Sequence, residues 1–113
     1  MSDLQIYPQY TPNPKSMKFI LNKNVINEGR ATFTSPEQAG DITLAKDLLA
    51  LPDVVQVYFF ENMITITQET DEWDTLSQMV KSVLMTRMAI HNPDINLDAQ
   101  KKKQREKLPA EIQ

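Results

Sequence analysis

The chain of 113 residues has the size of one domain and is long enough to bury a hydrophobic core. Its formal net charge of −3 gives no overall positive field that would gather nucleic acid or anionic lipid. The sequence contains no cysteine, which excludes disulfides, thiol catalysis and cysteine-held clusters within it. No apolar run approaches the ~20 residues that span a bilayer, and the first residues do not resemble a signal peptide, so we predict a soluble, cytoplasmic protein.

A segment with a restricted backbone precedes the first predicted strand. Residues 1–9 are mostly polar and allow a short extended edge. Pro12 and Pro14 then fix their own φ angles and keep the residue before each of them out of the helical region. Beyond them, Met17, Phe19 and Leu21 alternate with residues of the other face, which predicts a strand with one buried face.

A second strand and a first helix follow. Asparagines and a glycine favour a connection before residues 30–34, where Ala31 and Phe33 share a face. Ser35 before a proline is a helix start signal. Gly40 interrupts this start, and Asp41 offers a second cap for a helix at about residues 42–51.

The second half of the chain repeats the order of strands and helix. Residues 54–60 and 63–67 predict a hairpin, with Asn62 accepting positive φ at its turn. Asp71 can cap a last helix, which Asn92 and Pro93 close. Its apolar face is formed by Trp73, Leu76, Val80, Val83 and Leu84.

The predicted fold class is α+β: a two-layer sandwich of order β-β-α-β-β-α, with two helices on one face of a mostly antiparallel four-stranded sheet. The domain would span residues 1–93, and residues 94–113 would form a polar, basic tail, either a helical extension or a disordered segment. The residues expected to face the helices are Phe19, Phe33, Val55, Val57, Phe59, Ile64 and Ile66.

Few side chains are candidates for catalysis, metal binding or a partner interface. His91 is the only histidine, and we interpret it as a partly cationic group near a helix C-terminus. The carboxylates at positions 69, 71, 72 and 74 are best explained by helix capping, since they lack calcium-loop spacing. Trp73 fits the core, whereas Met85 and Met88 are more open to an interface role. The sequence therefore predicts no enzyme, and no metal or cofactor bound by this chain alone.

The order of short motifs resembles the N-terminal domain of Nfu/NifU-type iron–sulfur scaffold proteins. The resemblance covers roughly residues 6–88. Its motifs are Thr11-Pro12-Asn13-Pro14 with Met17-Lys18-Phe19, Phe33-Thr34-Ser35 with Glu37 and Ala39, Thr43-Leu44-Ala45 with Leu48, residues 54–60, Asn62-Met63-Ile64-Thr65-Ile66, and Trp73 at a helix start.

In that family, the cluster is carried by a Cys-X-X-Cys pair in the C-terminal domain, and the N-terminal domain helps to engage partners. The resemblance thus implies a free-standing relative, or a separated portion of a longer protein, that docks on an iron–sulfur carrier or client protein.

The segment around Pro12 and Pro14 has two compatible interpretations. In the structural one, the prolines set the entry of the strand and Asn13 caps a turn. In the functional one, the same rigidity presents a preorganised docking edge that loses little entropy on binding. Its partner-binding residues would be Tyr10, Thr11, Asn13, Lys15 and Lys18.

Two other functions stay open. A nucleic-acid or regulatory binding protein would use the basic run at residues 101–107 together with the sheet surface, although the acidic balance argues against it. A small enzyme would form its site around His91 at a homodimer interface.

Overall fold

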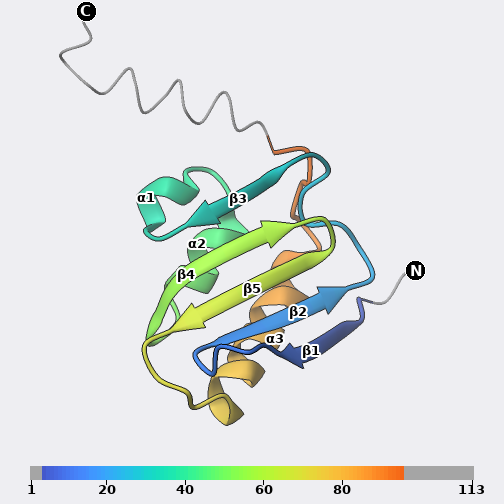
Figure 1. Ribbon diagram of the computed structural model, residues 1–113. Coiled ribbons are helices and arrows are strands. Elements are labelled where there is room, and N and C mark those ends of the chain that lie inside the picture. Colours follow the sequence, from blue (N-terminus) through green and yellow to red (C-terminus); the bar gives the residue numbers. More distant parts are fainter. Residues whose placement is uncertain (1–3, 96–113) are drawn as a thin grey trace, which may run out of the picture.

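The computed structural model describes residues 4–95. Its five strands form one antiparallel sheet in the spatial order β1-β2-β5-β4-β3. Figure 1 shows α2 and α3 behind this sheet, with α1 beside the edge strand β3. In chain order the elements are β1 (Ile6–Tyr10), β2 (Ser16–Leu21), β3 (Arg30–Phe33), α1 (Pro36–Ala39), α2 (Thr43–Leu49), β4 (Val54–Phe60), β5 (Met63–Gln68) and α3 (Asp74–Arg87).

The α+β class is confirmed, but the four-stranded sheet was wrong. The possible edge before the prolines is a full strand, β1, which pairs with β2 from Ile6↔Leu21 to Tyr10↔Met17. Its signal in the sequence is weak because β1 is largely exposed and contains Pro8, a residue that sheets tolerate mainly at their edges. Three strands therefore precede the helices, and α1 adds a short third helix to the two predicted.

The buried face of the sheet follows the predicted alternation except at one position. Val57 and Phe59 are fully buried, but Val55 is 38% exposed. A register shift between Val54 and Gln56 leaves Val55 unpaired, so that Val54 takes its place against the core. The buried strand residues are Ser16, Met17, Phe19, Leu21, Ala31, Phe33, Val57, Phe59, Ile64, Ile66 and Gln68.

The first helix start is as predicted, and the next two are not. Ser35 Oγ accepts a hydrogen bond from Gln38 N, with Pro36 in the first turn. In contrast, Ile42 occupies the N-cap position of α2 and makes no side-chain cap bond, so the cap expected from Asp41 was wrong.

Asp71 was also wrong as the cap of α3, because that helix begins three residues later and Trp73 occupies its N-cap position. Thr70 orders this stretch instead: its hydroxyl accepts from Glu72 N at 3.2 Å and donates to Gln68 Oε1 at 2.9 Å. Gln68 Nε2 in turn donates to Glu72 O at 2.9 Å. The buried glutamine thus fixes where the last helix can start.

The hairpin between β4 and β5 forms as predicted, but the positive φ falls on Glu61, at 55°, and not on Asn62. The Asn62 side chain is used elsewhere, since its Nδ2 donates to Leu21 O at 2.8 Å and so ties the turn to β2. A glutamate therefore carries a backbone conformation that asparagine adopts more easily.

Glu61→Asn is expected to stabilise the fold by up to about 1 kcal/mol, because asparagine lowers the cost of the left-handed conformation. The backbone contacts of residue 61, whose carbonyl accepts from Val25 N at 2.8 Å, do not depend on the side chain. Chemical denaturation followed by circular dichroism measures the change. Glu69→Asn, one residue after the end of β5, is the control, since Glu69 is exposed and is not among the described residues with positive φ.

Candidate interaction surface

The loop between β1 and β2, residues 11–15, contains Pro12 and Pro14 and is called the proline-set loop below. Its own polar groups hold it in shape. Thr11 Oγ1 accepts from Asn13 N at 3.1 Å and lies 2.9 Å from Asn13 O. Asn13 Oδ1 accepts from Lys15 N at 3.0 Å, and Ser16 N donates to Asn13 O at 3.0 Å. The polar side chains of Thr11 and Asn13 thus shape the loop itself.

The same loop is anchored to two distant elements. Trp73 Nε1 at the start of α3 donates to Pro14 O at 2.9 Å. Gln68 N at the end of β5 donates to Lys15 O at 2.9 Å, and the hydroxyls of Ser16 and Thr67 lie 2.8 Å apart. These contacts, 51 to 59 residues apart in the chain, make the loop a rigid corner of the domain.

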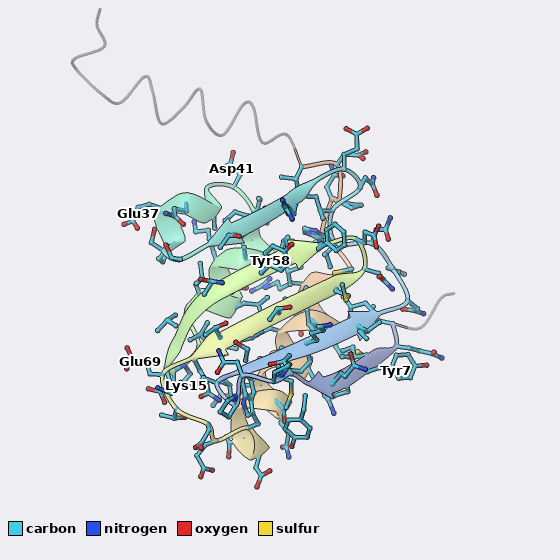
Figure 2. All side chains as sticks on the ribbon, in the orientation of Figure 1. Tyr7, Lys15, Glu37, Asp41, Tyr58 and Glu69 are labelled. Atoms are coloured by element: carbon cyan, nitrogen blue, oxygen red, sulfur yellow. The ribbon has the colours of Figure 1, made fainter. Side chains whose placement is uncertain are left out.

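The structure distributes the predicted partner-binding residues over two faces. Tyr10 is 76% exposed and pairs with Met17, which places it on the side of the helices. Lys18 is half-buried on the opposite side of β2. Lys15 is exposed in the loop, at the same end of the sheet as Glu69 in Figure 2. The five residues therefore surround one corner without forming a single patch.

The sequence named the sheet surface only in the nucleic-acid alternative and did not identify the residues of the open face, which lies on the side away from α2 and α3. One cross-strand row at this face runs through Tyr7, Ile20, Met63, Phe60 and Arg30, one residue from each strand. All five side chains are half-buried or exposed. The signal was present in the sequence, since apolar residues occupy strand positions that alternation assigns to solvent.

A second row of the open face lies beside the first and is more polar. It runs through Gln9, Lys18, Thr65, Tyr58 and Thr32. Figure 2 shows Tyr58 over β4 on the side of the sheet away from the helices. The open face therefore combines an apolar row with a row of hydroxyls, an amide and a cation.

His91 lies beyond the end of α3, half-buried against the core. Its Nε2 is 2.7 Å from Val25 O, so this nitrogen carries the proton and donates, and its ring meets Phe59 edge-on with centroids 5.8 Å apart. Burial lowers the pKa of His91 below its ordinary value, against the opposing effect of the Val25 hydrogen bond. The expected cationic role at a helix end was therefore wrong.

The lowered pKa of His91 predicts a loss of stability with acid. The unfolded chain binds a proton near pH 6.5, whereas the folded chain resists it. Stability is thus fully present above that pH and falls as pH drops below about 6.5. Thermal melts at pH 7.5, 6.5 and 5.5 measure this fall. His91→Gln retains a donor without titrating in this window, so a fall of the same size in that variant would contradict the prediction.

A cavity of about 240 Å³ lies next to His91, between the start of α2 and the segment after α3. Its lining includes Ile42, Ile90 and Asp94. Asp94 also accepts a hydrogen bond from Asn27, which fastens this segment to the loop after β2. Within residues 4–95 no group of three or more His, Asp or Glu side chains is placed to hold a metal ion.

Three large apolar side chains remain exposed on α3 and the segment after it, namely Met79, Met85 and Ile90. Trp73 is buried, at 6% exposure, which confirms its place in the core. Met88 is buried as well, so its predicted interface role was wrong, whereas Met85 is 57% exposed. Arg87 of α3 and Asp47 of α2 form an ion pair that ties the two helices together. In the described part of the chain, no helix is long and apolar enough to cross a membrane.

Comparison with known proteins identifies the fold and the family. The family model described as "Scaffold protein Nfu/NifU N terminal" matches residues 6–91. The chain belongs to this family. The match covers β1 to α3 and therefore includes the proline-set loop, the open face and His91.

The sequence relatives of this Nfu/NifU N-terminal domain are much longer proteins. "NifU-like protein 5, mitochondrial" of Arabidopsis thaliana is 34% identical over 84% of this chain and 34% of its own length. "NFU1 iron-sulfur cluster scaffold homolog, mitochondrial" of Homo sapiens is 35% identical over 71% of this chain and 32% of its own length. The chain thus spans about a third of the length of these relatives.

Two solved structures share the fold. The solution structure of a NifU-like protein from Saccharomyces cerevisiae has a TM-score of 0.69 at 18% identity, covering 81% of this chain and 83% of that one. The crystal structure of protein SAV1430 from Staphylococcus aureus has a TM-score of 0.62 at 23% identity, covering 71% of this chain and 98% of that one. Both are similar in architecture to the sheet and helices described above.

Proposed function

We propose that this chain is a non-catalytic protein-interaction module that assists iron–sulfur cluster assembly or delivery. It docks on a cysteine-bearing carrier or recipient protein without holding the cluster itself. The family relationship carries this proposal, because the matching model describes the N-terminal part of scaffold proteins and the human relative is named an iron–sulfur cluster scaffold homolog.

The residue types of the chain support a role in which it does not itself hold the cluster. Cysteine thiolates are the usual ligands of iron–sulfur clusters, and the sequence has none. The one histidine donates its Nε2 hydrogen to the Val25 carbonyl, and its lowered pKa keeps it neutral. An iron–sulfur cluster therefore reaches this chain only through a partner.

The proposed contact surface includes the rigid corner formed by the proline-set loop. Thr11 and Asn13 give the loop its shape, and Lys15 and Tyr10 present exposed side chains from it. A corner that is already ordered loses little conformational freedom on binding. Lys18 adds a cation on the neighbouring strand.

Binding to a defined carrier tests the proposal. The purified chain is titrated by calorimetry into the cysteine-bearing domain of a NifU-like protein, with and without a reconstituted cluster, and its own iron content is measured. We expect saturable binding to that domain and no stoichiometric iron in the chain alone. Iron that copurifies with this chain in a fixed ratio would overturn the proposal, as would absence of binding to both forms of the domain.

Variants of the corner locate the contact. Lys15→Glu is expected to weaken binding of the carrier domain, because it reverses an exposed charge without touching the hydrogen bonds of the loop backbone. Lys46→Glu makes the same charge change on α2 and serves as the matched control. Equal affinities of the two variants would remove the corner from the contact surface.

A nucleic-acid or regulatory binding protein is the second candidate, favoured by the aromatic residues Tyr58 and Phe60 of β4, which share the open face with Lys18, two strands away on β2. The basic run at residues 101–107 lies outside the described residues. Binding of a single-stranded oligonucleotide that falls steeply with salt, and is lost when that run is deleted, would support this candidate.

A further inference from the structure

The open face of the sheet carries a one-sided distribution of charge. None of the five strands contains an aspartate or a glutamate, although the chain has 15 acidic residues. The only charged strand residues are Lys18 and Arg30, and the register places both on the open face, in neighbouring rows. Within residues 4–95 the carboxylates thus lie in turns, loops and helices, and the strand residues of this face include two cations.

A continuous apolar strip lies between these cations. Ile20, Met63 and Phe60 occupy three adjacent strands in the first row, and Tyr58 lies two residues from Phe60 on β4, in the second row. They remain partly exposed because none of the helices within residues 4–95 covers this side of the sheet. Antiparallel sheets do present one face to water, but that face is normally polar. A strip of aromatic and aliphatic side chains is typical of a surface that contacts another protein.

We propose that the open face of the sheet is a docking surface for an acidic, apolar polypeptide segment of a partner protein. The apolar side chains of that segment cover Ile20, Met63 and Phe60, and its carboxylates meet Lys18 and Arg30 at the two sides of the strip. The inference deepens the proposed function, on which the identity of the partner rests. The face itself is defined by charge and shape alone.

Other occupants fit the charges less well. The chain's own run at residues 101–107 has five cations and one carboxylate, so it carries the same sign as the face. A second copy docked through the same face by two-fold symmetry would set Lys18 and Arg30 against cations of the same kind. Nucleic acid would find only two cations on the strands, few for a ligand whose affinity depends on phosphate neutralisation.

A titration with defined peptides tests the proposal. The ¹⁵N-labelled chain is titrated with an eight-residue peptide of alternating Glu and Phe or Leu, with its Lys-for-Glu counterpart, and with a single-stranded oligonucleotide. We expect the acidic peptide to shift the amide signals of Lys18, Tyr58 and Met63, and the basic peptide to leave them in place. Because the attraction is partly electrostatic, the affinity for the acidic peptide should fall as salt is raised.

Paired variants separate charge from apolar contact. The double variant Lys18→Glu, Arg30→Glu is expected to weaken acidic-peptide binding at least tenfold, and Phe60→Ser to weaken it at constant charge. Lys46→Glu and Met85→Ser make similar changes on the helix side, where Met85 is 57% exposed, and should leave the affinity unchanged. Circular dichroism melts confirm that each variant is folded before it is compared.

The outcomes separate this inference from the proposed function. Carrier binding that is insensitive to the open-face variants would overturn the inference and leave the function standing. Acidic-peptide binding at the face without any carrier binding would overturn the proposed function and leave the inference standing. Equal shifts by the acidic and basic peptides, tighter binding of the oligonucleotide, or concentration-dependent dimerisation through the same residues would each overturn the docking of an acidic segment.

Discussion

Trp73→Ala is expected to lower the free energy of unfolding by about 3–5 kcal/mol, which is a large part of the stability of a domain of this size. Trp73 is 6% exposed and its ring lies 6.4 Å from that of Phe19, so its loss leaves a cavity between α3 and β2. It also removes the hydrogen bond from the indole to Pro14 O. Urea denaturation followed by circular dichroism measures the change.

Trp73→Phe separates the two contributions. It retains an aromatic ring against Phe19 but cannot donate to Pro14 O, so we expect a smaller loss of about 1–2 kcal/mol. Because Gln68 N donates to the neighbouring Lys15 O, faster hydrogen exchange at Gln68 would report a loosened corner. Unchanged exchange there, together with wild-type stability, would show that the indole does not hold the proline-set loop.

Phe59→Ala is expected to cost about 3–5 kcal/mol as well, because Phe59 is fully buried in the central part of the core. Its ring contacts Phe33 edge-on with centroids 5.4 Å apart and meets His91 at 5.8 Å. Its removal therefore disturbs the sheet and the segment after α3 together. Chemical denaturation gives the loss of stability.

Tyr58→Ala is the matched control for Phe59→Ala, since the two aromatic residues are neighbours in β4 and point to opposite faces. Tyr58 is only half-buried on the open face, so its loss should cost well under half as much stability. The same variant is expected to weaken docking of an acidic segment. Equal destabilisation by the two variants would mean that the open face is packed like the core, which would contradict the arrangement described here.

The sequence predicted buried positions correctly where one face of an element is buried and the other is exposed to solvent. Alternation assigned Met17, Phe19 and Leu21 to the core correctly, and a serine before a proline located the start of α1. It failed at Val55, because a bulge inserts one residue and reverses which positions face the helices. A register shift of this kind cannot be recognised from the local sequence in a run of β-branched residues.

The candidate surface was predictable only in part. The motif around Pro12 and Pro14 drew attention to the corner that is part of the proposed contact surface, and Lys18 was among the residues chosen there. Ile20, Phe60 and Arg30 were not, because each is an ordinary residue of its own strand. They come together only through the pairing of the four strands β2, β5, β4 and β3. The match of the family model to residues 6–91 confirmed the resemblance that the motifs had indicated.

By itself, the sequence determined the class of fold, most of the core and the lack of thiolate ligands, because hydrophobic period and residue chemistry are local properties of a chain. Only the tertiary structure decided that β1 completes the sheet, that Trp73 holds the proline-set loop 59 residues away, and that two cations share an open apolar face. These features depend on strand order and register, which arise from contacts between segments distant in the chain.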